Sequence, residues 1–193
     1  MLFSSIPFLY YFLPPVLALY FFSPKKWRNA VLLLASLIFY GWGEPRYVLL
    51  MLVSVFFGYL FGLLIERFRE TPASKAACIL SVAVSLSFLL YFKYTDFFLE
   101  SFNAVTGQNI PLLKIALPIG ISFYTFQVIS YTIDVYRGVP AQKSFVRLAA
   151  YISMFPQLIA GPIVRYSDIA AQLEERTLSV SAAAAGIRRF ILG

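Results

Sequence analysis

The chain has 193 residues, of which 60% are hydrophobic and only 13% are charged, and its mean hydropathy is +0.78. A soluble domain carries about 25% charged residues, so this composition excludes an ordinary soluble globule and indicates an integral membrane protein. The net charge of +7 does not indicate a nucleic-acid partner, because lysines and arginines stand singly or in pairs between hydrophobic runs, where they mark membrane topology.

Six runs without a charged residue predict the membrane segments of an all-α, multi-pass bundle. They cover residues 1–24, 29–43, 47–65, 76–92, 115–133 and 148–164. A helix needs about 20 apolar residues to cross a bilayer, which the third, fourth and fifth runs supply. The second run is short, but Trp27 and Trp42 flank it as interfacial anchors do. Pro14 and Pro15 predict a kink in the first run rather than its end.

The connections carry the residues that end and begin helices. Residues 41–45 (GWGEP) predict a tight turn between two spans. Residues 96–113 predict an amphipathic interfacial helix that stops at 106–111. Pro118 is expected to open the fifth helix, where its missing N–H has no partner to lose, and Lys93 is expected to reach the membrane interface with its long side chain.

The sixth run contains helix breakers at membrane depth: Pro156, Gly161 and Pro162. They predict a broken or re-entrant helix near residues 155–165. Irregular backbone in contact with lipid would leave peptide groups unpaired, so such a break must be buried in protein or line a wet cavity. Arg165 follows directly, either as a topology-setting or headgroup-anchoring arginine or as a bidentate ligand for a phosphate or carboxylate.

The fifth run carries a polar stripe. Helical periodicity places Gln127, Ser130, Tyr131 and Asp134 on one face, and the residues at 124 and 137 extend it. The stripe is either hydrogen-bonding contact between helices, with Asp134 paired to the arginine at 137, or the wall of a cavity. We favour the cavity wall and expect this face to contact the broken stretch 156–165, which would make Gln127, Tyr131, Asp134 and the residues of that stretch candidates for a substrate path.

The distribution of lysine and arginine predicts the orientation of the chain. The connections 25–28, 66–75 and 137–147 hold nine of these residues, and the connections 44–46, 93–114 and 165–176 hold five. The positive-inside rule then places the first group in the cytoplasm and the N-terminus outside.

The chain has no histidine and one cysteine, Cys78. This excludes an internal disulfide, a cysteine-based metal cluster, and histidine-based metal sites, triads or acid–base catalysis within the chain, so we expect no metal and no bound cofactor. Thr177 or Ser179 is expected to cap a last, alanine-rich helix that continues to the final residue. We therefore expect residues 1–193 to be the N-terminal part of a single membrane domain in a longer protein.

Four segments are read together, in chain order: 91–97 (YFKYTDF), 117–126 (LPIGISFYTF), 131–138 (YTIDVYRG) and 155–166 (FPQLIAGPIVRY). With the opening 1–5 (MLFSS), they resemble the membrane-bound O-acyltransferase family, and within it the bacterial alginate O-acetyltransferase branch. The resemblance covers nearly the whole chain in order, although any single segment would be weak evidence.

The resemblance implies a multi-pass enzyme of the cell membrane that moves acetyl groups, directly or by relay, onto hydroxyls of an exported, alginate-like polysaccharide. It implies an acyl thioester such as acetyl-coenzyme A as the donor and a catalytic histidine downstream of residues 155–166, hence no catalytic residue in this chain. Membrane lipid, the polysaccharide and an extracytoplasmic acetyltransferase are the implied partners. The alternatives are a transporter or channel, whose broken helices look similar, and D-alanyl transfer to teichoic acid within the same superfamily.

Overall fold

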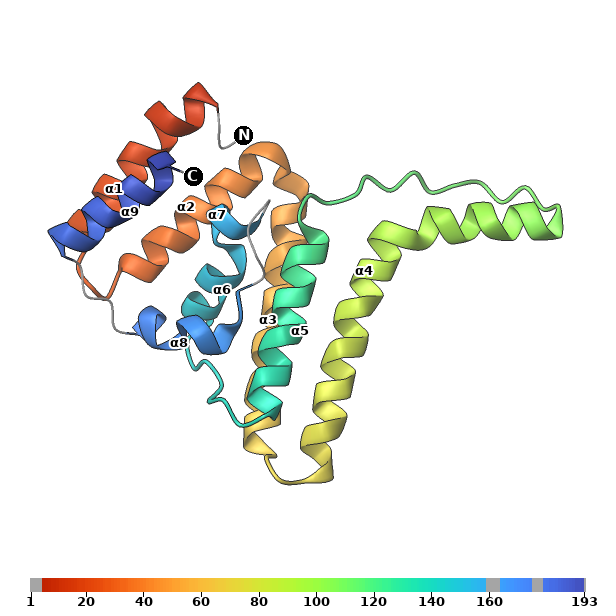
Figure 1. The fold of residues 1–193 in the computed structure, drawn as a ribbon. Coiled ribbons are helices and arrows are strands. Elements are labelled where there is room, and N and C mark those ends of the chain that lie inside the picture. Colours follow the sequence, from red (N-terminus) through yellow and green to blue (C-terminus); the bar gives the residue numbers. More distant parts are fainter. Residues whose placement is uncertain (1–4, 159–163, 175–178, 193) are drawn as a thin grey trace.

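In the computed structural model every regular element in the described residues, 5–158, 164–174 and 179–192, is a helix (Figure 1). In chain order they are η1 (Pro7–Phe12), α1 (Leu13–Phe22), α2 (Arg28–Gly43), η2 (Pro45–Tyr47), α3 (Val48–Arg67), α4 (Pro72–Thr106), α5 (Ile121–Tyr136), α6 (Phe145–Ser153), α7 (Phe155–Leu158), α8 (Tyr166–Glu174) and α9 (Val180–Leu192).

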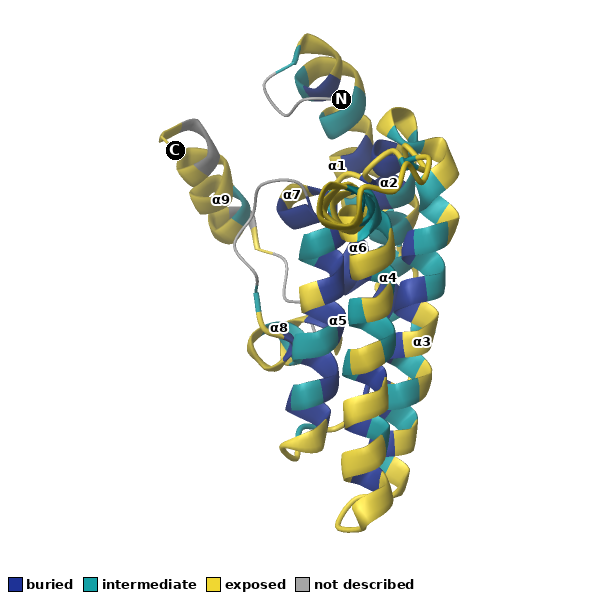
Figure 2. Cartoon of the chain, turned by 90° about the vertical axis from the view of Figure 1, so that its right-hand side faces the viewer, coloured by how far each residue is buried: buried dark blue, intermediate teal, exposed yellow. Residues whose placement is uncertain are grey.

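Two helical stretches in the described chain, Pro45–Arg67 and Pro72–Thr106, are long and apolar enough to cross a membrane, and the stretch Pro7–Phe22 is apolar but shorter. Many large apolar side chains lie on the outside of the bundle, and the outward faces of α4 and α9 are mostly exposed in Figure 2. Apolar side chains on the outside suit a lipid solvent rather than water. The all-helical membrane fold predicted from the sequence is therefore confirmed, while the number of six membrane segments stays a prediction.

The helices α3, α4 and α5 lie side by side and form the main core (Figure 1). Small residues on α3 allow α5 to approach closely. A Cβ atom added at Gly58 would lie 2.7 Å from Cγ1 of Val128, and one added at Gly62 would overlap the hydroxyl of Tyr131. Small residues at a four-residue spacing are how membrane helices bring their backbones together.

The proline pair is accommodated by a change of helix type. The chain forms the π-helix η1 and then continues as α1, with Pro14 in the first turn of α1. The prediction that the prolines would not end this segment is confirmed. A separate aromatic cluster joins it to α2 and α7, since the ring centroids of Phe8, Phe39 and Phe155 lie 5.6–6.0 Å apart.

The boundaries of two predicted elements were wrong. Residues 96–106 are not a separate helix but the last part of α4, which ends at Thr106 as expected because Gly107 adopts a left-handed conformation with φ of 70°. Pro118 does not open α5, which begins at Ile121. Gly120, with φ of 74°, precedes it as the N-cap residue, and its carbonyl accepts a helical hydrogen bond from the amide of Tyr124 at 3.1 Å.

The sixth charge-free run is broken, as predicted, and its helices α6 and α7 form a re-entrant hairpin with α8, which lies beyond the run. The helix α6 ends where Met154 turns out of the helix with ψ of 114°, slightly before the predicted region, and Pro156 is tolerated in the first turn of α7. The chain then returns along α8. Arg147, at the start of α6, pairs with Glu174 at the end of α8 at 3.1 Å, so both ends of the hairpin lie at the same end of the bundle.

This hairpin corrects the predicted alternation of the loops. The side chain of Asn29, at the start of α2, donates to the carbonyl of Leu173 at 2.9 Å, which also places the end of α8 beside the connection before α2. The end of α8, in the described part of the connection 165–176, therefore does not lie with 44–46 and 93–114. Those two connections hold three lysines and arginines, against nine in 25–28, 66–75 and 137–147, so the charge asymmetry is sharper than the sequence suggested.

Candidate functional site

The polar stripe on α5 points into the protein, as predicted. Tyr124, Gln127 and Tyr131 are at most 1% exposed, and Asp134 is 8% exposed. Ser130 is half-buried. The stripe belongs to the interior of the bundle because α5 is covered by α3 and α4 on one side and by α6 and α8 on the other.

The ion pair between Asp134 and Arg137, part of the alternative interpretation of the stripe, is not present among the described residues. Arg137 lies just past the end of α5 and is exposed, while the carboxylate of Asp134 lies inside, within electrostatic range of the phenol of Tyr151 on α6. A buried carboxylate is unfavourable unless hydrogen bonds or a counter-charge compensate it, so Asp134 is not explained as part of a surface pair.

Three buried oxygen atoms on α5 have no hydrogen-bond partner among the described residues: the hydroxyl of Tyr124, Oε1 of Gln127 and Oδ2 of Asp134. We call these residues the unpartnered set. Only two other buried side-chain atoms in the described part of the chain share this property, one on Ser81 and one on Asn29. Leaving such a group unsatisfied costs about 1–3 kcal/mol, and native proteins contain few of them. Their concentration on one helix marks this helix as the candidate site.

The flanks of the broken stretch meet α5 at two levels. At the start of α5, a Cβ atom added to Gly120 would lie 2.9 Å from the carbonyl oxygen of Leu158. Further along, the rings of Tyr131 and Tyr166 lie 5.0 Å apart in an edge-to-face arrangement. Tyr131 of the stripe therefore contacts Tyr166, just past the broken stretch, and the predicted contact between the stripe and residues 156–165 themselves stays a prediction.

The other predicted residues of the broken stretch are placed differently. Gly161 and Pro162 lie outside the described residues. Pro156 and Arg165 are exposed, so the structure does not bring these two side chains to the unpartnered set. Next to Arg165, the carbonyl of Val164 accepts a hydrogen bond from the hydroxyl of Tyr151 at 2.6 Å, which ties the returning chain to α6.

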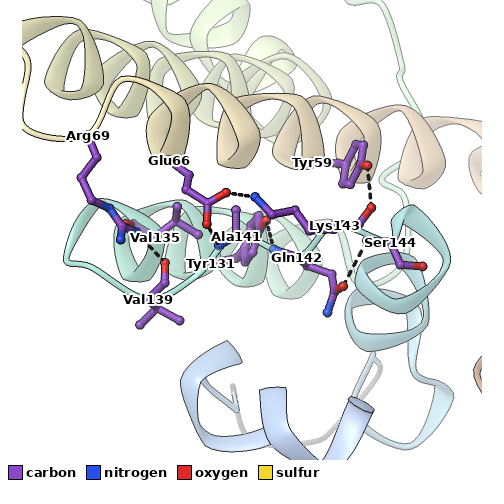
Figure 3. Close-up of polar contacts among 10 residues, drawn as sticks. All are labelled: Tyr59, Glu66, Arg69, Tyr131, Val135, Val139, Ala141, Gln142, Lys143 and Ser144. Atoms are coloured by element: carbon purple, nitrogen blue, oxygen red, sulfur yellow. Dashed lines mark hydrogen bonds and ion pairs between the residues drawn. The ribbon is translucent and has the colours of Figure 1, made fainter.

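The sequence analysis missed a set of polar residues that fixes the loop between α5 and α6 (Figure 3). Glu66 on α3 accepts a hydrogen bond from the amide of Ala141 at 3.1 Å and pairs with Lys143. Tyr59 donates to the carbonyl of Lys143 at 2.9 Å, and Arg69 donates to the carbonyl of Val139 at 3.0 Å. Three side chains of α3 and the turn after it thus hold one loop.

Gln142 joins this loop to α5 and α8. Its backbone amide donates to the hydroxyl of Tyr131 at 3.1 Å, its side-chain amide donates to the hydroxyl of Tyr166 at 3.1 Å, and its side-chain oxygen accepts from the amide of Ser144 at 3.0 Å. We call Tyr131, Gln142 and Tyr166 the loop anchor. Because its members are far apart in sequence and follow no periodic pattern, no sequence signal identified it.

A cleft of about 370 Å³ lies beside the re-entrant hairpin, between α1, α2 and α8. It is lined mainly by apolar side chains, among them Val16, Leu32, Phe155 and Ile169, with Gln157 as a polar member. The side-chain amide of Gln157 donates to the carbonyl of Tyr151 at 3.0 Å. The cleft thus lies next to the break between α6 and α7. Its lining is mainly apolar and offers few polar groups that could bind a substrate.

The polar groups of the unpartnered set suit recognition by hydrogen bonds. No group of three or more acidic, cysteine or histidine side chains that could hold a metal occurs in the part of the chain that the structure describes. The three atoms of the unpartnered set include two acceptors, Oε1 of Gln127 and Oδ2 of Asp134, and one hydroxyl. Such groups suit a partner that donates hydrogen bonds, for example a hydroxyl or water.

Comparison with known proteins identifies relatives over the whole chain. The chain is 44% identical to the probable alginate O-acetylase AlgI of Pseudomonas aeruginosa. It is 42% identical to the probable alginate O-acetylase AlgI of Azotobacter vinelandii, and both matches cover 100% of the chain. It is 33% identical to the peptidoglycan O-acetyltransferase of Helicobacter pylori over 90% of the chain. No family model and no solved structure matches.

The chain is therefore homologous to the alginate O-acetylases throughout its length, as the resemblance implied. It spans 38% of the Pseudomonas aeruginosa relative and 40% of the Azotobacter vinelandii one, so it corresponds to about two fifths of these proteins.

Proposed function

We propose that this chain is part of a membrane-bound O-acyltransferase that transfers acetyl groups, directly or by relay, to hydroxyls of an exported cell-envelope polysaccharide. The observation that carries the proposal is the 44% identity to an alginate O-acetylase over the entire chain. The apolar helices and this homology support a location in the bacterial inner membrane. An acetyltransferase on the extracytoplasmic side is the partner expected for a relay.

Within such an enzyme, the unpartnered set would line the path of a hydroxyl-bearing substrate. Water would occupy the same path before the substrate binds. Oε1 of Gln127 and Oδ2 of Asp134 are acceptors without a donor among the described residues, and a sugar hydroxyl or a water molecule supplies one. Preorganised polar groups in a site shielded from water orient a reactant at little further cost. Tyr124, Gln127 and Asp134 would then position the substrate. Tyr131, whose hydroxyl accepts from the amide of Gln142, would hold the loop instead, and the outward-facing Pro156 and Arg165 would not touch the substrate.

The transfer itself needs a base and a donor that this chain does not supply. A histidine base would remove the proton from the hydroxyl as the oxygen attacks the acyl carbon, and the chain has no histidine. We therefore assign the base to the part of the protein beyond residue 193 and propose an acyl thioester, such as acetyl-coenzyme A, as the donor. The chain alone is expected to transfer no acetyl group, and transfer by the purified 193-residue chain would contradict this assignment.

The comparisons support the alternative acceptor and the alternative functions to different degrees. The relative from Helicobacter pylori is a peptidoglycan O-acetyltransferase, so peptidoglycan is a second candidate acceptor. The named relatives are probable alginate O-acetylases and a peptidoglycan O-acetyltransferase, which favours O-acetylation over transport and gives no support to D-alanyl transfer. Measuring acetate released from purified alginate-like polymer and from peptidoglycan, in cells with and without the gene, would separate the two acceptors.

Three substitutions in the protein expressed from its complete gene test the substrate path: Gln127→Leu, Asp134→Asn and Arg165→Lys. Gln127→Leu and Asp134→Asn should lower polysaccharide acetylation at least about tenfold, as loss of a positioning hydrogen bond does, at normal membrane yield. Arg165→Lys should change little because Arg165 is exposed, and Gln108→Leu in an exposed loop serves as a control. Normal acetylation in the two buried variants would reduce the stripe to a structural role.

The orientation is tested by cysteine labelling. We propose that the end of the bundle with the connections 66–75 and 137–147 is cytoplasmic, because its lysines and arginines outnumber those at the other end. In a Cys78→Ala background, Lys75→Cys should resist a membrane-impermeant thiol reagent added to intact cells, and Gln108→Cys should react. The reverse pattern would invert the orientation.

A further inference from the structure

The last part of α4 leaves the bundle as an arm. The helix has 35 residues, which at 1.5 Å per residue is about 50 Å, whereas the hydrocarbon core of a bilayer is about 30 Å thick. Figure 1 shows that α4 bends and that its last part runs away from the bundle, nearly across the direction of α3 and α5. The helix α4 is therefore longer than is needed to cross the membrane. The part beyond the crossing length runs in a different direction (Figure 1).

The arm is amphipathic, and its apolar face is exposed. Phe97, Phe98, Phe102 and Val105 fall on one side of the helix and are 60%, 57%, 48% and 87% exposed. The opposite side carries Asp96, Glu100 and Asn103, at positions i, i+4 and i+7. Exposed aromatic side chains that share one face indicate a surface that another apolar phase covers.

The polar face is already covered in part by the chain itself. After Thr106 the chain runs back along the helix, and the carboxylate of Asp96 accepts hydrogen bonds from the amides of Leu113 at 2.9 Å and Ile115 at 3.2 Å. The side chain of Asn103 donates to the carbonyl of Ile110 at 2.9 Å and accepts from its amide at 3.1 Å. The returning chain thus covers Asp96 and Asn103, while Glu100 and the whole apolar face stay exposed.

Residues beside the arm are those typical of a membrane–water interface. Tyr91 and Trp42 are exposed at this end of the bundle. Lys93 lies over the ring of Tyr94, with Nζ 5.4 Å from the ring centre, and the hydroxyl of Tyr47 donates to the carbonyl of Ala116, where the returning chain rejoins the bundle, at 2.6 Å. Tyrosine, tryptophan and lysine gather at the level of the lipid headgroups.

We propose that residues 94–106 lie in the plane of the membrane interface, with Phe97, Phe98, Phe102 and Val105 inserted among the lipid chains just below the headgroups. Lipid is the occupant because the face is continuous with a helix that already has the length to cross the membrane, and the interfacial residues stand at the bend. The charges around the arm balance, with Asp96 and Glu100 against Lys93 and Lys114. Insertion is therefore driven by apolar area and needs no anionic lipid.

The test places an environment-sensitive fluorophore on each face of the arm in the complete protein. Single cysteines replace Phe98 or Glu100 in a Cys78→Ala background, and the labelled proteins are reconstituted into vesicles of phosphatidylcholine alone. A lipid carrying a nitroxide near its headgroup should quench the probe at 98 about threefold more than the probe at 100, and iodide in the buffer should show the opposite preference. Adding anionic lipid should leave both results unchanged.

Other results would overturn the proposal. Equal quenching of both probes by iodide would mean that the arm lies in water. Protection of the probe at 98 from both quenchers would mean that protein covers the face, and formation of a disulfide-linked dimer through the cysteine at 98 would assign it to a second copy of the chain.

Discussion

The helix α5 takes part in two buried polar regions that differ in one respect. In the loop anchor, the hydroxyl of Tyr131 accepts from the amide of Gln142, and the side chain of Gln142 is bonded at both ends. In the unpartnered set, Tyr124, Gln127 and Asp134 are nearly as buried but each keeps an oxygen without a partner among the described residues.

The presence or absence of a hydrogen-bond partner separates polar groups with a structural role from candidate functional groups on the same helix. Satisfied groups fix a loop and stabilise the fold by about 0.5–1.5 kcal/mol each. Unsatisfied groups at the same depth destabilise it, so a role other than stability must account for them. The loop anchor and the unpartnered set cannot be told apart by burial, because both are buried. Only their hydrogen-bond partners distinguish them.

The largest expected effect comes from filling the space that seats Tyr131. Gly62→Leu would place a side chain where the Tyr131 hydroxyl lies, and Tyr131 cannot move aside because it is fully buried and bonded to the loop. We expect a loss of about 3 kcal/mol or more, measured by denaturant unfolding in detergent. The matched control is Gly186→Leu on α9, where an added Cβ would meet nothing within 4 Å. Equal losses in both variants would show that Gly62 is not a contact point.

The loop anchor is tested directly by Gln142→Leu. The change leaves the hydroxyl of Tyr166 and the amide of Ser144 without the partners they have now. Because both partners are buried or half-buried, the expected loss is about 2 kcal/mol. The same unfolding measurement applies, with the exposed Gln108→Leu as the control. A loss no larger than that of the control would mean that water replaces the side chain.

The unpartnered set should behave in the opposite way. Gln127→Leu removes an acceptor that has no partner among the described residues, so the free energy of unfolding should fall by no more than about 0.6 kcal/mol, the average for a hydrogen bond between membrane helices. The acetylation assay of the complete protein should nevertheless show a clear loss. If Gln127→Leu destabilises as much as Gln142→Leu, the comparison between the two regions fails.

The smallest effect is expected at the edge of the loop. Lys143 pairs with Glu66, but its side chain is 68% exposed. Lys143→Met should therefore cost only about 0.5 kcal/mol, as exposed ion pairs do, and raising the salt concentration should reduce even this difference. A loss comparable to that of Gln142→Leu would place the ion pair among the groups that hold the loop.

The positions of the helices could be predicted from the sequence where a single local property, such as the absence of charge, determines them. Charge-free runs located the helices because charged side chains are unfavourable inside a membrane, and Ser179 does cap α9 by accepting from the amide of Ala182 at 3.1 Å. Helix ends that depend on backbone conformation were less predictable. Gly120 in a left-handed conformation delays α5 until Ile121, although Pro118 is the stronger signal in sequence.

The sequence by itself determined that the chain is a helical membrane protein, that Gln127, Tyr131 and Asp134 share one inward face, and which family it resembles. These conclusions depend on composition, on the 3.6-residue period and on ordered motifs, all of which are local. Only the tertiary structure decided that the chain returns along α8 to the end of the bundle where α6 begins, because that depends on Arg147 meeting Glu174. Only the tertiary structure separated Tyr131 from Gln127, because the hydrogen-bond partner of a buried group lies on another element, at no fixed distance along the chain.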